Sequence, residues 1–243
     1  MIASLPMYDR PEIAAANDTL WAGIRQALGY GPQTLDRATP VWDVWQSPDL
    51  LMSQTCGFPY RTRLHGKVQL VGVPDYGLAH TPAGHYHSVF VVRHDDMSEL
   101  AHYAERTFAL NDTLSQSGWI APQLHARQLG FTFRKTMISG SHRESACAVA
   151  SGRADIAAID AVSWRLIQTH DGFANNLRVI GQTRPTPGLP LICARGRDAT
   201  ALFSAFCEAV DHLSPNHRKM LGLRGIVAIS PDDYLSMPAP KPS

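Results

Sequence analysis

The sequence predicts a protein of the α/β class. Short apolar runs typical of strands alternate with amphipathic runs typical of helices along almost the whole chain, and this order favours largely parallel sheets. The length of 243 residues is enough for one large domain or for two small lobes with separate cores. Hydrogen-bonding side chains gather where strands end and helices begin, which is where open α/β sheets bind ligands.

The first half of the chain begins this alternation. Strands are expected at residues 1–8, 49–55, 67–76, 87–93 and 107–112. Helices are expected at residues 11–28, with Pro11 in the first turn, and at residues 98–107. The run HSVFVVR at residues 87–93 is apolar and rich in β-branched residues, as expected for a strand that is covered on both faces.

The second half continues the pattern without an internal repeat or a long low-complexity linker. Helices are expected at residues 114–130, 142–153, 161–170 and 199–213, with one more after Pro215, and strands at residues 155–160, 177–183 and 191–195. If the chain crosses between lobes near residues 87–93 and again near residues 186–195, both termini lie in the same lobe. We therefore expect lobe one at residues 1–90 and 190–243, and lobe two at residues 91–189.

The composition gives no sign of a nucleic-acid or membrane partner. The chain is 44% hydrophobic and 18% charged, its formal net charge is +1, and it lacks a run of Lys and Arg. It also lacks an apolar run of about 18 residues, the length that spans a bilayer. The first residues, MIASLPMYDRPE, do not have the pattern of a secretory signal. We expect either a cytoplasmic protein or an exported protein recorded without its leader.

Cysteine and histidine residues offer weak candidates for an enzyme or a metal centre. Cys56 could form a nucleophilic pair with His85 or His87, and His80 could join these two histidines around zinc. No spacing shows such a dyad, no carboxylate or thiolate motif accompanies the histidines, and the four cysteines have no CxxC spacing. We expect no catalytic residues, no metal and no cofactor.

The stretch LNDTLSQSGWIAP at residues 110–122 carries more hydrogen-bonding groups than a helix start needs. A single Ser, Thr, Asp or Asn is enough to cap a helix. Ser115, Gln116 and Ser117, with Gly118 allowing close approach, predict an anion cradle at the positive end of the following helix. A role limited to capping is the alternative.

Five motifs resemble a known family. In chain order they are LMSQTCGFPY, HYHSVFVVR, ALNDTLSQSG, SGSHRES and GRADIAAIDAVSW, and the resemblance that they carry covers roughly residues 3–195. Together they resemble the phosphonate/phosphite/phosphate-binding proteins of ABC transporters. The resemblance implies a type II periplasmic-binding-protein fold, in which two α/β lobes are joined by two hinge strands and close on a ligand. It also implies that the protein is exported, that it is monomeric and that it has a permease partner.

Ten residues are expected to bind the ligand. The position of polar residues at strand ends predicts Gln54 and Thr55 as contacts. The resemblance implies an aromatic clamp, an oxyanion cradle, a second helix start and a polar strand end. The matching residues are Tyr8 and Tyr86 for the clamp, Ser115, Gln116 and Ser117 for the cradle, Ser141 and His142 for the helix start, and Asp160 for the strand end.

Two of these residues have alternative interpretations. Asp160 would repel a dianion, so it fits a ligand that donates a proton to it; otherwise it caps the helix at residues 161–170. His142 donates to the ligand or is a first-turn residue on the helix surface. Val162 and Leu189 stand where relatives that hold an aminoalkyl phosphonate have carboxylates, which disfavours a ligand with an ammonium group.

The ligand itself is left open among phosphate, phosphite, methylphosphonate, other oxyanions and small uncharged molecules. An intracellular sensor, or an enzyme on the same scaffold as in thiamine-pyrimidine synthesis, is the alternative function. A regulator is disfavoured because the chain has no recognisable helix-turn-helix addition.

Overall fold

The computed structural model describes residues 1–239, which form two compact units. Unit 1 comprises Met1–His85 and Pro187–Ser236, and unit 2 comprises Tyr86–Thr186 together with Met237–Ala239. The chain therefore enters unit 2 after His85 and returns to unit 1 after Thr186.

Two short strands lie at the two points where the chain crosses between the units. They are β4 (His85–Tyr86) and β10 (Thr186–Pro187), which pair as a two-stranded sheet.

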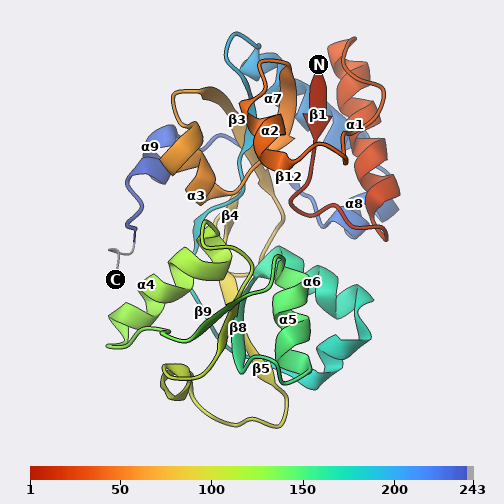
Figure 1. Ribbon diagram of the computed structural model, residues 1–243. Coiled ribbons are helices and arrows are strands. Elements are labelled where there is room, and N and C mark those ends of the chain that lie inside the picture. Colours follow the sequence, from red (N-terminus) through yellow and green to blue (C-terminus); the bar gives the residue numbers. More distant parts are fainter. Residues whose placement is uncertain (240–243) are drawn as a thin grey trace. The chain divides into compact units, whose positions relative to one another are not determined.

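Unit 1 is built on a five-stranded sheet with the order β1-β2-β11-β3-β12 (Figure 1). The strands are β1 (Ile2–Ser4), β2 (Leu50–Gln54), β11 (Leu191–Ala194), β3 (Val68–Asp75) and β12 (Gly225–Val227). Only β1 and β2 are parallel neighbours; β11 is antiparallel to β2 and β3, and β12 is antiparallel to β3.

The helices of unit 1 come from both ends of the chain. They are α1 (Ala14–Leu28), α2 (Val41–Gln46), α3 (Gly57–Pro59) continuing into the π-helical η1 (Tyr60–Leu64), α7 (Ala199–His212), α8 (Pro215–Leu221) and α9 (Pro231–Leu235). Helices α1 and α7 pack against each other. A Cβ at Gly23 would lie only 3.1 Å from Ala209 Cβ, so a small residue permits this close approach.

Unit 2 is built on a second five-stranded sheet, with the order β7-β6-β8-β5-β9 (Figure 1). Its strands are β7 (Thr136–Ile138), β6 (Phe108–Leu110), β8 (Ile156–Asp160), β5 (Ser88–Arg93) and β9 (Leu177–Gln182). Its helices are the 3₁₀-helical η2 (Leu100–Tyr103) and η4 (Gly172–Asn176), the π-helical η3 (Gln116–Ile120) continuing into α4 (Ala121–Gln128), α5 (His142–Ala150) and α6 (Ala161–His170).

The central strands of unit 2 bury side chains on both faces. In β8, Ala157 and Ile159 pack into one apolar cluster with residues of α5 and α6, whereas Ile156 and Ala158 pack into another with Ala126 of α4. Successive side chains of a strand point to opposite faces, so the continuous apolar runs of β5 and β8 serve two cores. The prediction of a doubly covered strand at residues 87–93 is confirmed by β5, although this strand begins at Ser88.

The prediction of largely parallel sheets is wrong, because both sheets are mixed. In unit 2, β7, β6 and β8 are parallel, but β5 is antiparallel to both β8 and β9. The antiparallel members include β5 and β11, the strands that directly follow the two crossings between units, and both run antiparallel to the neighbours that flank them.

Several predicted elements are shorter than expected. α1 begins at Ala14, so Pro11 lies in the turn before the helix, and β1 ends at Ser4, so Tyr8 lies outside the strand. The helix expected at residues 98–107 is reduced to η2. The sequence also failed to predict α2, α3, β7, β12 and α9, which are too short for a hydrophobic period to repeat.

Candidate functional site

Polar residues of unit 2 converge at one end of its sheet. The parallel strands β6, β7 and β8 end there, so the segments that follow them lie at the same edge, and β5 begins there with Ser88 paired to Asp160. We call this region the polar end of unit 2; it comprises Ser88, Asn111, Ser115–Ser117, Ser141, His142 and Asp160. Six of the ten predicted ligand contacts belong to it.

The start of η3 holds the three residues of the predicted cradle. Ser115 is the N-cap, and its Oγ accepts a hydrogen bond from the N–H of Gly118 at 2.9 Å. The hydroxyl of Ser88 donates to the carbonyl of Ser117 at 2.8 Å, which fixes this turn against β5. Ser115, Gln116 and Ser117 are all buried.

Gly118 is required by a close approach within the protein. A Cβ at this position would lie 1.8 Å from Oδ1 of Asn111, the residue that follows β6. The sequence reading attributed this glycine to the approach of a ligand. The structure shows that the side chain of Asn111 occupies the space, which the residue pattern alone did not reveal.

His142 links the start of α5 to the start of η3. It is the first residue of α5, and its Nε2 lies 2.9 Å from Ser117 Oγ. Burial lowers the pKa of His142 to about 4, and the nearby carbonyl of Ala158 opposes part of this shift. The ring is therefore a neutral imidazole near pH 7. His142 lies in the first turn of α5 and is half-buried, with its ring Nδ1 turned inward.

Ser141 and Asp160 both cap helices. Ser141 Oγ accepts from Glu144 N–H at 3.1 Å at the start of α5. Asp160 is 1% exposed, and its Oδ1 accepts from the N–H groups of Val162 and Ser163 at 2.7 and 3.1 Å. The capping role of Asp160 is thus confirmed. A carboxylate has about four acceptor sites, so capping by one oxygen is compatible with a further role.

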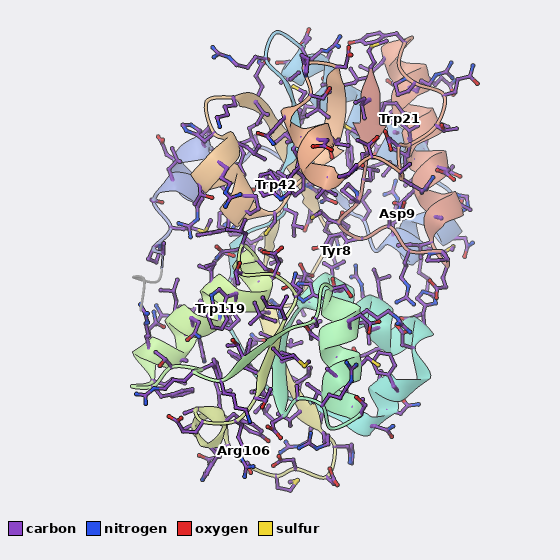
Figure 2. All side chains as sticks on the ribbon, in the orientation of Figure 1. Tyr8, Asp9, Trp21, Trp42, Arg106 and Trp119 are labelled. Carbon is purple, nitrogen blue, oxygen red and sulfur yellow. The ribbon has the colours of Figure 1, made fainter. Side chains whose placement is uncertain are left out.

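In unit 1, Tyr8 lies in the loop between β1 and α1 (Figures 1 and 2). Its ring packs edge-on against Tyr76, with 4.9 Å between the ring centroids. The next residue, Asp9, accepts hydrogen bonds from Asn17 Nδ2 at 2.9 Å and from Arg37 Nε at 2.6 Å. These contacts anchor the loop and therefore position Tyr8.

Gln54 and Thr55 lie at the end of β2, and both are buried. Gln54 Nε2 donates to the carbonyl of Leu189 at 3.2 Å and to the hydroxyl of Tyr76 at 3.3 Å. Thr55 Oγ1 is buried and makes no hydrogen bond within the described part of the chain. The sequence reading missed Tyr76, although this residue follows β3 at a strand end, the same position that selected Gln54.

A small pocket lies beside these residues inside unit 1. Its volume of about 20 Å³ is enough for one water molecule. Leu5, Tyr8, Ile13, Asn17, Leu20, Gln54, Pro74, Tyr76, Phe206, Leu221 and Leu223 line it. It is mostly apolar and too small for a ligand of several heavy atoms.

Tyr86, the tenth predicted contact, is a buried residue of β4. Of its neighbours, His85 is half-buried and its ring lies 3.1 Å from the carbonyl of Ala83, while burial lowers the pKa of His87. Among residues 1–239 there is no group of three His, Cys, Asp or Glu side chains placed to hold a metal ion. No helix within this range has the length and apolar character needed to cross a bilayer.

Comparisons with known proteins agree with this fold. The family described as "ABC transporter, phosphonate, periplasmic substrate-binding protein" matches residues 55–234. PhnD1 from Prochlorococcus marinus in complex with methylphosphonate has a TM-score of 0.73 at 15% identity, covering 96% of this chain and 94% of that one. A binding protein component of an ABC phosphonate transporter from Pseudomonas aeruginosa has a TM-score of 0.68 at 18% identity, covering 96% and 83%.

A Xanthomonas citri protein bound to ATP is also similar, with a TM-score of 0.70 at 16% identity, covering 96% of this chain and 92% of that one. No curated protein matches the chain. The solved structures establish the type II periplasmic-binding-protein fold with two mixed sheets. Because the family match spans most of the sequence, the chain belongs to the family of phosphonate-binding periplasmic substrate-binding proteins of ABC transporters.

Proposed function

We propose that this chain captures a small phosphorus oxyanion as the substrate-binding component of an ABC transporter. The observation that carries the proposal is the 2.9 Å contact between Ser117 Oγ, at the start of η3, and Nε2 of the half-buried His142. η3 runs directly into α4, so the helix dipole of both segments favours negative charge at this end. Hydroxyl, amide and first-turn N–H groups are the donors that an oxyanion requires.

The number of donors is sufficient for useful affinity. Hydrogen bonds to a charged group contribute roughly 1.5–3 kcal/mol each. Micromolar binding corresponds to about 8 kcal/mol, after the costs of association have been met. Three to five such bonds, roughly the number that the serines and first-turn N–H groups can supply, therefore suffice.

Unit 1 supplies the remaining proposed contacts. The buried hydroxyl of Thr55 supports a ligand role, because a buried polar group without a partner is destabilising until something binds it. The anchored ring of Tyr8 provides an apolar wall. Tyr86 in unit 2 would complete the aromatic clamp. Closure of two lobes on the ligand, a permease partner, a monomeric state and a periplasmic location stay predictions that follow from the family.

The ligand class follows from the charges of the buried residues. Val162 and Leu189 are buried and apolar, so they provide no carboxylate for an ammonium group. This favours phosphate, phosphite or a simple alkylphosphonate over 2-aminoethylphosphonate.

A thermal-shift screen tests the proposal. Purified protein is heated with phosphate, phosphite, methylphosphonate, 2-aminoethylphosphonate, sulfonates, ATP and a pyrimidine. A ligand at a hundredfold excess over Kd stabilises the folded state by about 2.7 kcal/mol, which raises Tm by several degrees. We expect such a shift with a phosphorus oxyanion, and we expect Ser117→Ala to abolish it.

Ser214→Ala is the matched control. Ser214 caps α8 in unit 1 by accepting from His217 N–H at 3.1 Å, so its loss lowers Tm but should preserve the ligand-induced shift. If the wild-type protein responds to none of the phosphorus oxyanions, or if Ser117→Ala responds as the wild type does, the proposed cradle is wrong.

A further inference from the structure

The charges at the polar end of unit 2 are unusual for an anion site. Asp160 brings a carboxylate to the edge where Ser117 and His142 meet, and the imidazole beside it is neutral near pH 7. Arg143 on α5 is held by Asp171 at 2.7 Å and by Glu144 at 2.9 Å. Anion binding at this end therefore depends on dipoles and hydroxyls, while Asp160 repels each negative charge that the ligand carries.

The other titratable groups on the packed elements do not change this balance. His87 precedes β5, His125 lies on α4, and burial is the main cause that lowers the pKa of each. Asp112, in the segment after β6, adds a second carboxylate and accepts from Leu114 N–H at 2.6 Å. Arg165 lies more than a turn beyond Asp160 along α6 and has interactions of its own.

Ser117 Oγ and His142 Nε2 share one hydrogen bond, 2.9 Å long, in which either atom can be the donor. The carboxylate of Asp160, in contrast, can only accept, and its Oδ1 already accepts from the N–H groups of Val162 and Ser163.

We propose that the polar end of unit 2 selects the singly charged, protonated form of a phosphorus oxyanion over its dianion, with Asp160 accepting the hydrogen bond of the ligand's P–OH group. This inference rests on the proposed function, because it specifies the ionic form that the same site takes. A monoanion carries a P–OH donor that the carboxylate of Asp160 can accept. A dianion has no such donor, and its extra charge faces the carboxylate of Asp160.

The affinity of the wild-type protein as a function of pH tests this selection. Calorimetric titrations with methylphosphonate, phosphite and phosphate are run between about pH 5.5 and pH 8.5, across the second ionisation of each ligand, which lies near pH 6 for phosphate esters. Only the monoanion fraction is competent to bind, so the measured Kd should weaken about tenfold per pH unit above that ionisation. Sulfate, which has no proton in this range, should not bind.

Comparison of ligands separates titration of the ligand from titration of the protein. If the ligand's proton is responsible, the pH at which affinity begins to fall should move with the second ionisation of each ligand. A break at the same pH for all three ligands would assign the effect to a group of the protein and would overturn the inference.

Asp160→Asn tests the role of the carboxylate. The amide oxygen can still cap α6, whereas the amide nitrogen now donates to the ligand, so the variant should lose the pH dependence and gain binding of sulfate. Asp198→Asn is the matched control, because Asp198 caps α7 by accepting from Ala201 N–H at 2.9 Å and lies in unit 1. It should keep the wild-type profile.

The outcomes distinguish the two proposals. If no phosphorus oxyanion binds at any pH, the proposed function fails. If phosphorus oxyanions bind but affinity rises with pH, or sulfate binds as tightly, the proposed function stands and the selection of the monoanion is wrong. The wild-type titrations decide this even if Asp160→Asn does not fold.

Discussion

At the residue scale, the predicted ligand contacts differ in how fully the fold already uses them. Gln54 bridges Tyr76 and the Leu189 carbonyl, and Ser115 and Asp160 cap helices. Thr55 Oγ1, in contrast, is buried without a hydrogen bond among the described residues. Substitution of Thr55 should therefore report on ligand binding more cleanly than substitution of Gln54, whose loss also removes internal hydrogen bonds.

His142 predicts a pH dependence of stability. Its folded pKa of about 4 lies below the ordinary value of 6.5, so between these values the unfolded chain binds a proton that the folded protein does not. The free energy of unfolding should therefore fall as the pH decreases through this window, by up to about 3 kcal/mol. Urea unfolding at a series of pH values measures the effect, and His142→Gln should reduce the slope.

The exposed His102 provides the control for this prediction, and His102→Gln should leave the profile unchanged. Part of the slope should remain in His142→Gln, because burial also lowers the pKa values of His87 and His125. An unaltered profile in His142→Gln would contradict a lowered pKa of His142 in the folded protein.

At the scale of elements, the start of η3 depends on its contact with the segment after β6. Gly118→Ala would place a Cβ 1.8 Å from Asn111 Oδ1, so one of the two segments must move. We expect the free energy of unfolding to fall by about 1–3 kcal/mol, as for other overpacked sites. Chemical denaturation measures the change.

A second substitution tests the cause. Asn111→Ala removes the clashing oxygen, so the double variant Asn111→Ala/Gly118→Ala should recover part of the loss. Gly172→Ala is the control, because a Cβ there meets no atom within 4 Å, and its effect should stay within about 0.5 kcal/mol. Simple additivity of Asn111→Ala and Gly118→Ala would mean that the two residues do not interact.

At the scale of the whole molecule, unit 1 is assembled from two distant parts of the chain. α1 from the first part packs on α7 from the second, and β11 inserts between β2 and β3. Near the C-terminus, the ring of Tyr234 on α9 packs edge-on against Tyr60 of η1, with 5.1 Å between centroids. Its hydroxyl donates to the Gly188 carbonyl at 2.7 Å. Gly188 lies close to the point after Thr186 where the chain returns to unit 1.

Tyr234 therefore contributes to the stability of unit 1 through packing and through one hydrogen bond. Tyr234 is fully buried, so Tyr234→Phe should cost about 1 kcal/mol and Tyr234→Ala about 3–5 kcal/mol of unfolding free energy. Urea denaturation followed by circular dichroism measures both. Tyr30→Phe is the control at a 42% exposed tyrosine, and it should have no measurable effect. Equal losses in Tyr234→Phe and Tyr30→Phe would rule out the buried hydrogen bond.

Long, periodic elements were predictable from the sequence, whereas short ones and strand directions were not. α6 has the predicted bounds, and α7 differs from its prediction by one residue, because an amphipathic helix of several turns repeats its signal. β7 and β12 contain three residues each and carry no repeat. Strand direction depends on how the chain passes between sheets, which local hydrophobicity does not encode.

The candidate site was predictable in residue type but not in geometry. Serine, threonine, aspartate and histidine at strand ends and helix starts indicate a polar ligand from their positions alone. That Ser117 meets His142, twenty-five residues further along the chain, follows only from the parallel pairing of β6 with β7 and β8. Tyr76 was missed for the same reason, since its partner Gln54 is distant in sequence.

By itself, the sequence determined the α/β class, the positions of the main helices and strands, and the five motifs of the phosphonate-binding family. These properties depend on local periodicity and on residue order, which are present in the chain before it folds. Only the tertiary structure decided that the sheets are mixed, that Asn111 fills the space beside Gly118, and that burial lowers the pKa of His142. Burial and hydrogen-bond partners set these properties, and both arise when residues distant in sequence pack together.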